Sequence, residues 1–191
     1  MTFDLMDFFT ETPFVGTNED NPLRRQALDL FDRCLAEGNE TPLIAFIERQ
    51  IIVEPPDLQL LGEIADDLQQ RLMTLRTSQF HEREAVVDTF AQLGVDITPA
   101  IPANALDDYY RVQPGALITL AYKQGTPIAH DETARLVHLI EESTRTAGRL
   151  HREIEMTIQL QALLDDWIEA LSVTASWRYW PQNDRRETYI H

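Results

Sequence analysis

Mostly apolar residues recur at alternating steps of four and three along the segment from 127 to 175, and we call such a row of positions a stripe. They are Leu136, Ile140, Ser143, Ala147, Leu150, Ile154, Thr157, Gln161, Leu164, Ile168, Leu171 and Ala175. Their average spacing of 3.5 residues keeps one face of a helix against a partner helix. A helix of about 45 residues is roughly 68 Å long, which exceeds the width of a compact domain of 191 residues. The pattern therefore predicts an elongated helical bundle.

A second stripe predicts another long helix, over about 57–93. Its positions are Leu61, Ala65, Leu68, Leu72, Leu75, Gln79, Glu82, Val86, Thr89 and Leu93. Gln79 and Glu82 interrupt it with polar side chains. Either the helix meets a polar neighbour there, or it bends and the stripe moves to Phe80, Val87 and Phe90. Each long helix has a strong apolar block at one end and a weaker interior. This shared design favours antiparallel packing of the two, at a crossing angle of about +20°.

Two shorter helices are predicted ahead of the long ones, over about 22–37 and 42–53. Each begins with an asparagine or threonine N-cap followed by proline, at 21–22 and 41–42, which is a typical helix start. Gly38 ends the first helix in the place where helices favour glycine, and a pair of prolines ends the second. These helices form a small head on the bundle.

The segment 95–125 is the least regular and is rich in proline and glycine. Two short helices fit within 104–124, although 114–124 also suits a buried strand. A strand there would lack a partner, because no other segment alternates convincingly between apolar and polar residues. The sequence thus predicts an all-α class, with a helical domain over 21–176 between two terminal segments.

Charge narrows the choice of partners. The chain has 32 acidic and 16 basic residues, a net charge of −16. This balance argues against direct binding to nucleic acid or to an anionic membrane, both of which need a basic face. Cys34 is the single cysteine and is expected to be a buried thiol. With neither a signal peptide nor a membrane span predicted, we expect a cytoplasmic location.

Catalytic motifs are weak throughout. Acidic pairs such as Asp66-Asp67 and Glu141-Glu142 suggest a metal, but no Glu-x-x-His unit of a di-iron bundle accompanies them. Neighbouring residues on a helix point about 100° apart, so solvated faces explain these pairs better. The chain also lacks glycine-rich phosphate loops and a nucleophile elbow. We therefore predict no catalytic, cofactor-binding or metal-binding residues, and no enzyme activity.

The terminal segments carry the strongest signals of interaction. Residues 1–20 interleave large apolar residues with acids, which is typical of a segment that is loose alone and docks on a surface. Residues 177–191 are locally basic and aromatic, and Trp, Tyr and Arg are enriched at interface hot spots. The predicted partner-binding residues are Trp177, Arg178, Tyr179, Trp180, Arg185, Arg186, Phe8 and Phe9.

These observations favour a non-enzymatic protein–protein interaction module, such as an adaptor, regulator or assembly factor. Its partner would be another protein. The partner could also be a second copy of the chain, because the same stripes can pair helices within one chain or between two chains. The alternative is a small-molecule-binding or catalytic helical protein. Its pocket would lie under 95–125, among Tyr109, Tyr110, Arg111 and Tyr122. A third hypothesis, acidic mimicry of nucleic acid, requires acids on one face, whereas here they are spread along every predicted helix.

Overall fold

The structure is a computed structural model, and it describes residues 21–53 and 55–178. Within these ranges the chain forms helices and no strand, which confirms the predicted all-α class. The helices are α1 (Pro22–Glu37), α2 (Thr41–Gln50), α3 (Leu58–Gln92), the 3-10 helix η1 (Ala103–Arg111), α4 (Pro114–Lys123) and α5 (His130–Arg178). The segment that suited either a helix or a strand is therefore the helix α4.

Local sequence explains where the first helix begins and ends. The side chain of Asn21 accepts a hydrogen bond from the backbone N–H of Leu23 at 2.9 Å, and Pro22 occupies the first turn. At the other end Gly38 takes a left-handed conformation, with φ of 67°, and its N–H donates to the carbonyl of Cys34. A left-handed residue is strained unless it is glycine, so Gly38 fixes the turn between α1 and α2.

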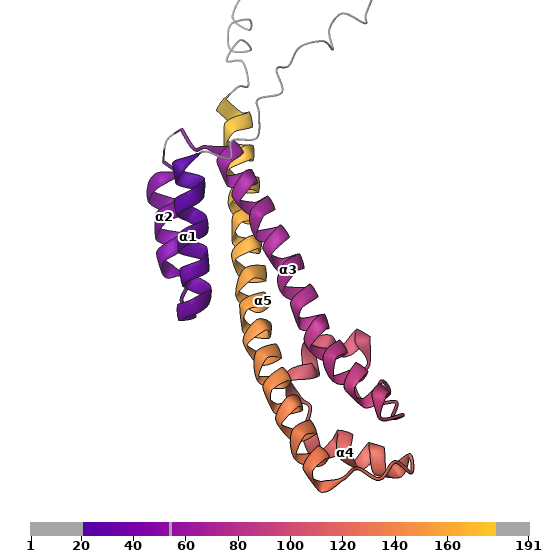
Figure 1. Cartoon of the computed structure of the whole chain (residues 1–191). Coiled ribbons are helices and arrows are strands. Elements are labelled where there is room, and N and C mark those ends of the chain that lie inside the picture. Colours follow the sequence, from indigo (N-terminus) through magenta and orange to yellow (C-terminus); the bar gives the residue numbers. More distant parts are fainter. Residues whose placement is uncertain (1–20, 54, 179–191) are drawn as a thin grey trace, which may run out of the picture.

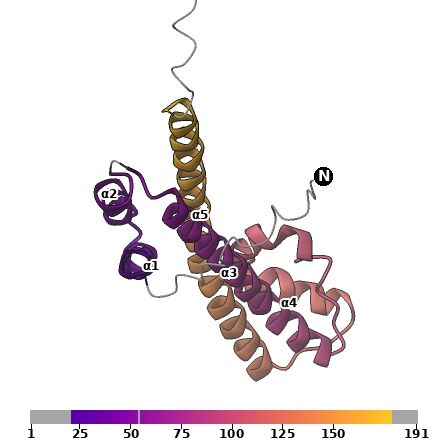
Figure 2. The same ribbon diagram turned by 90° about the horizontal axis from the view of Figure 1, so that it is seen from above.

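The long helices α3 and α5 lie side by side through most of their length and form the frame of the molecule (Figure 1). With 49 residues, α5 is roughly 73 Å long. The pair α1–α2 lies beside one half of this frame, and α4 lies near its other end. Seen from above, α1–α2 and α4 are on opposite sides of α3 and α5 (Figure 2).

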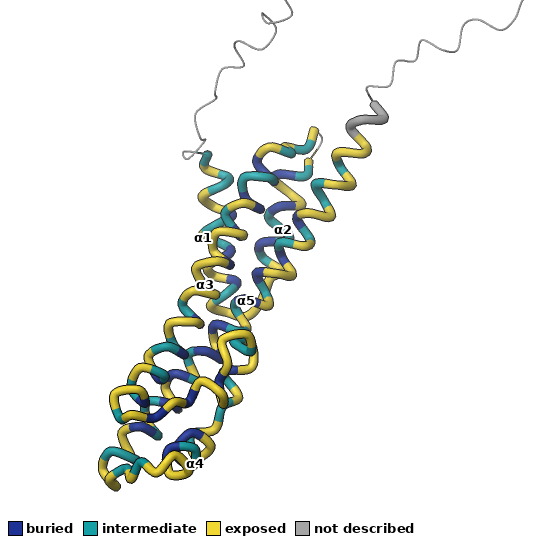
Figure 3. Tube along the Cα trace, turned by 90° about the vertical axis from the view of Figure 1, so that its right-hand side faces the viewer, coloured by how far each residue is buried: buried dark blue, intermediate teal, exposed yellow. Residues whose placement is uncertain are grey.

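The buried residues, dark blue in Figure 3, belong to three hydrophobic clusters along the frame. The first joins α1 and α2 to the beginning of α3 and the later part of α5. The second joins the end of α3 and the first part of α5 to η1, α4 and the segment between α3 and η1. Between them lies a third cluster with only four buried residues, Leu72, Leu75, Leu150 and Ile154. We call this middle region, whose four buried residues come from α3 and α5 alone, the waist.

The predicted stripe of α5 is buried from Leu136 to Thr157, after which Leu160 is buried while Gln161 is only partly covered. The stripe of α3 departs from the prediction after Gln79. Arg83 and Phe90 are buried in place of Glu82 and Thr89. Of the three residues in the alternative stripe, Phe90 is buried and Val87 is partly buried, whereas Phe80 is 39 % exposed, so that alternative is wrong at Phe80. The buried positions make two successive steps of four here, which shifts the buried face of a helix.

Gln79 is fully buried in this region, and neither polar atom of its side-chain amide has a hydrogen-bond partner. A buried polar group without a partner costs about 1–3 kcal/mol, and replacing it by an apolar group of similar shape removes that cost. Gln79 therefore lowers the stability of the pairing between α3 and α5.

We expect Gln79→Met to raise the free energy of unfolding by about 1–2 kcal/mol, because methionine has a similar length and no amide to desolvate. Chemical denaturation followed by circular dichroism measures this change. Gln69→Met, at an exposed position of the same helix, is the control and should stay within about 0.5 kcal/mol of the parent. A destabilised Gln79→Met protein would contradict the prediction.

Candidate binding groove

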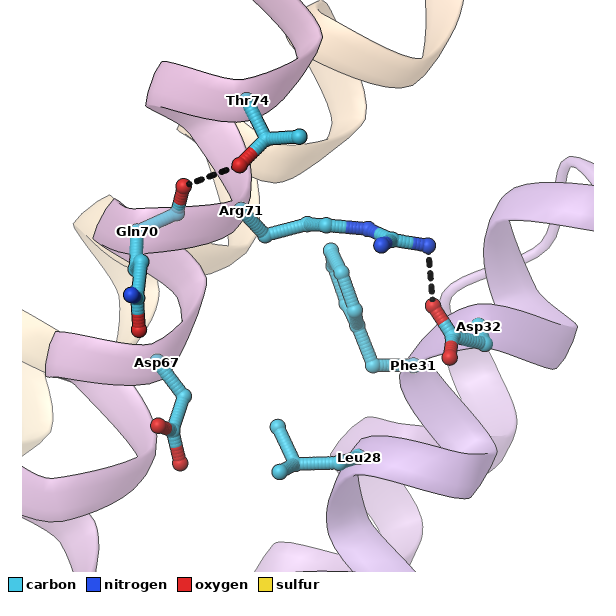
Figure 4. Close-up of a pocket in the computed structure, with 7 residues that line it drawn as sticks. All are labelled: Leu28, Phe31, Asp32, Asp67, Gln70, Arg71 and Thr74. Carbon is cyan, nitrogen blue, oxygen red and sulfur yellow. Dashed lines mark hydrogen bonds and ion pairs between the residues drawn. The ribbon is translucent and has the colours of Figure 1, made fainter.

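Two neighbouring hollows open beside α1, just before the waist. The smaller, with a volume of about 280 Å³, lies between α1 and α3; we call it the α1–α3 hollow (Figure 4). The larger, about 790 Å³, lies between the end of α1, Arg71 of α3, and α5; we call it the arginine groove. Its lining residues are Asp32, Leu35, Ala36, Glu37, Gly38, Arg71, Arg149, Arg152, Glu153 and Met156. Asp32 and Arg71 line both hollows.

Ion pairs from α1 to α3 hold the walls of the hollows in place. Near the start of α1, the guanidinium of Arg24 donates two hydrogen bonds of 2.7 Å to the carboxylate of Asp67, and it lies 3.6 Å from Glu63. Two turns further along α1, Arg71 reaches across from α3 and donates to Asp32 at 2.8 Å (Figure 4). The first pair is largely buried, whereas the side chains of Arg71 and Asp32 are about half exposed. The Arg24 pair is therefore the stronger anchor of α1.

Three arginines from two helices line the arginine groove, in a chain with only 16 basic residues. Arg71 pairs with Asp32, and Arg149 lies 3.7 Å from Glu153. Arg152 is exposed and forms no ion pair with the described residues, and the same holds for the groove carboxylate of Glu37. Guanidinium groups bind carboxylates through paired hydrogen bonds, so Arg152 is the groove residue best placed to receive an acidic group.

The region proposed for a small-molecule pocket is instead tightly packed around Tyr109. The hydroxyl of Ser143 donates to the carbonyl of Glu82 at 2.8 Å, so the hydroxyl of Tyr109 donates to Ser143 Oγ, also at 2.8 Å. Burial raises the pKa of Tyr109, and its bond to Ser143 offsets part of that rise. The cavity beside it has a volume of about 80 Å³, well below the roughly 300–1,000 Å³ of ligand pockets.

The other aromatic residues of that region contact separate neighbours. Tyr110 stacks on His151 with ring centroids 4.7 Å apart, and the guanidinium of Arg111 lies 5.1 Å from the centre of the Tyr110 ring. Tyr122 is half exposed and donates to the carbonyl of Ile128. The Tyr110–His151 stack joins η1 to α5, and of the four predicted residues only Tyr109 lines the cavity of about 80 Å³.

The partner-binding residues predicted from the sequence lie mostly outside the described ranges. The backbone of Trp177 and Arg178 belongs to the last turn of α5, but their side chains are not described. Tyr179, Trp180, Arg185, Arg186, Phe8 and Phe9 are outside the described residues altogether.

Sequence reasoning missed the arginine groove. Arg149 and Arg152 are three residues apart on a polar face of α5, which looks like an ordinary solvated face. They lie across the groove from the end of α1 only because helices more than 100 residues apart in the chain pack together.

Comparison of the chain with models of protein families, with curated protein sequences and with solved structures gives no match. Across residues 21–53 and 55–178, no three potential metal ligands gather closely enough to hold an ion. In the same ranges, no helix combines the length and the apolarity needed to cross a bilayer. The functional assignment therefore depends on the geometry of the described helices.

Arg24→Met is expected to lower the free energy of unfolding by about 1–3 kcal/mol, because it leaves the partly buried carboxylate of Asp67 without its hydrogen-bond donor. Arg71→Met removes a half-exposed pair and should cost less than about 1 kcal/mol. Urea denaturation of both variants gives the comparison. An equal or larger loss from Arg71→Met would show that the exposed pair is the main anchor of α1.

Tyr109→Phe is expected to cost about 1 kcal/mol at pH 8, because it removes a buried hydrogen bond. The pKa of Tyr109 is higher in the folded chain than in the unfolded chain. The stability it provides is therefore complete below about pH 10 and is lost as the pH rises through its folded pKa. The difference between parent and variant should accordingly shrink above pH 10, as measured by thermal unfolding across this range. Tyr122→Phe is the exposed control, and a difference that stays constant for Tyr109→Phe would contradict the prediction.

Proposed function

We propose that this chain is a non-enzymatic interaction module, an adaptor, regulator or assembly factor, that binds a segment of another protein in the arginine groove. In this proposal α3 and α5 act as two antiparallel, heptad-patterned helices of an elongated bundle, and α1–α2 is the head that forms one wall of the groove. The terminal residues Trp177, Trp180, Phe8 and Phe9 provide further points of contact. We further propose a cytoplasmic location, with a second copy of the chain among the possible partners.

The observation that carries the proposal is the lining of the arginine groove. Six of its ten lining residues are charged, and its apolar surface comes mainly from Leu35 and Met156. Small-molecule sites are mostly apolar, with a few polar groups, whereas peptide-binding surfaces that read acidic motifs use clusters of arginine. Three of the charged residues are arginines and three are acids, and Arg152 is the arginine that forms no ion pair with the described residues. The groove therefore fits a protein segment that places a carboxylate at Arg152 beside one or two apolar side chains.

The net charge of −16 opposes the approach of an acidic segment at long range. At physiological salt, however, interactions between exposed charges more than about 8 Å apart are largely screened. At contact, the three arginines of the groove balance its own three acids, Asp32, Glu37 and Glu153, so the local charge is near zero although the whole chain is strongly acidic. Binding of an acidic segment should consequently be stronger at about 0.15 M salt than at very low ionic strength, where repulsion by the whole chain is unscreened.

The test compares the parent protein with Arg149→Gln/Arg152→Gln in capture of partners from native lysate, followed by binding measurements with the purified partner. We expect the double variant to bind at least tenfold more weakly. Arg33→Gln/Arg135→Gln removes the same charge from α1 and α5 at exposed positions outside the groove and serves as the control. Equal loss in both variants, or no loss in the groove variant, would refute the groove as the binding surface.

A chain ending at Ala175 separates the groove from the C-terminal segment. If the groove is the principal surface, this shortened chain keeps the partner and remains sensitive to Arg149→Gln/Arg152→Gln. Loss of the partner with the C-terminal segment alone would instead assign binding to Trp177 and the residues that follow it.

A further inference from the structure

We infer that, in the free protein, the arginine groove is occupied by residues 1–12 of the same chain. This inference rests on the proposed function, since it assigns the same groove an internal competitor for the partner segment. Residues 1–12 have the sequence MTFDLMDFFTET, which combines three carboxylates with six large apolar side chains. This is the chemistry for which the groove was proposed above.

The length of the chain allows this placement. The N-terminal segment joins α1 at Asn21, and the groove lies at the opposite end of α1, beside Asp32, Leu35 and Gly38. The 16 residues of α1 span about 24 Å. Eight residues, 13–20, reach about 26 Å when extended. They are therefore long enough to return along α1, and residues 1–12 remain for the groove.

A track for this return runs along α1. The α1–α3 hollow is lined by Leu28 and Phe31, and it shares Asp32 and Arg71 with the groove, so the two hollows adjoin (Figure 4). Leu28 and Phe31 are directed from α1 into the space that faces α3. A segment that follows α1 toward the groove passes a mixed surface, Leu28 beside Asp67, Gln70 and Thr74, and then reaches Asp32 and Arg71 where the two hollows meet.

The charged residues of the groove include one that attracts the carboxylates of residues 1–12 and one that repels them. Asp4, Asp7 and Glu11 carry the negative charge, and Arg152 has no acidic partner among the described residues. Asp32 and Glu153 are already paired with Arg71 and Arg149. Glu37 forms no ion pair with the described residues and repels the segment. Neutralising Arg152 should therefore weaken docking, and neutralising Glu37 should strengthen it.

Docking within one chain has a concentration advantage. A short linker gives a tethered segment an effective concentration in the millimolar range. Docking with an intrinsic dissociation constant below the millimolar range is therefore enough to keep the groove mostly occupied in the free protein. A partner segment must displace residues 1–12. Its apparent affinity therefore depends on the difference between the free energy with which the partner binds the groove and the free energy with which residues 1–12 dock there.

Disulfide trapping in the full-length chain tests this inference. In a Cys34→Ala background, Phe8→Cys is combined with Ala36→Cys, an exposed position that lines the groove. A disulfide requires Cα atoms within about 7 Å. The control pairs Phe8→Cys with Ala162→Cys, exposed on α5 outside the groove. We expect the 8–36 disulfide to form at least tenfold faster than the 8–162 disulfide, as followed by mass spectrometry of the intact chain.

Two charge variants test the inference further, because they should change the rate of formation of the 8–36 disulfide in opposite directions. Arg152→Gln should slow the formation of the 8–36 disulfide several-fold, and Glu37→Gln should speed it. Equal rates at positions 36 and 162, or rates that do not respond to either charge change, would overturn the inference. A disulfide that forms between chains, at a rate proportional to protein concentration, would overturn it in favour of a second copy as the occupant.

This experiment is independent of the test of the proposed function, because trapping requires no partner. Failure of the 8–36 disulfide, together with groove-dependent partner binding, refutes only the internal occupant. A rapid 8–36 disulfide, together with partner binding that ignores Arg149→Gln/Arg152→Gln, refutes the proposed function and leaves the internal docking in place.

Discussion

The packing of α3 against α5 at the waist is the interaction on which the remaining structure depends. Four residues, Leu72, Leu75, Leu150 and Ile154, form the whole buried cluster there, and each contributes about 1.5–3 kcal/mol by burial. The clusters on either side each need both long helices as walls. If the two helices separated at the waist, α1–α2 and η1–α4 would become two units joined only by long helices.

Polar residues in this interface are tolerated because almost all of them have partners. Arg83 donates to the carbonyl of Ile101 and pairs with Glu84, and the hydroxyl of Thr157 donates to the carbonyl of Glu153 in its own helix. Ser143 connects Tyr109 of η1 to the backbone of α3. These bonds join η1 to both long helices. Among the described residues, the side-chain amide of Gln79 and the Nδ1 atom of His151 are buried without a hydrogen-bond partner, and both residues lie near the waist.

The same arrangement creates the candidate groove. Because α1 ends at Gly38, next to the waist, none of the described helices covers the adjoining faces of α3 and α5. Arg71, Arg149 and Arg152 line the opening that remains, and ion pairs hold α1 at its edge. The proposed binding surface is thus a consequence of how far α1 extends along the frame, and a longer α1 would fill it.

The spacing of apolar residues was enough to predict the helices and most of their buried faces. Helical periodicity is a local property, so Leu136 and Ile140 of α5 and Leu68 and Leu72 of α3 could be assigned to the interior without knowledge of their partners. The caps at Asn21 and Gly38 were equally readable, because each depends on a few neighbouring residues. The buried thiol of Cys34 followed from its place on an apolar face.

Tertiary structure alone decided which polar residues are buried and where the groove lies. Arg83 is buried because the carbonyl of Ile101, 18 residues away, accepts its hydrogen bond, and periodicity carries no information about such a partner. Phe80 stays exposed for the complementary reason, since the buried face of α3 turns toward η1 and α5 instead. The groove needs α1, α3 and α5 at once. Its arginines look like ordinary surface residues in the sequence, because Arg71 comes close to Arg149 and Arg152 only when α3 and α5 pack together.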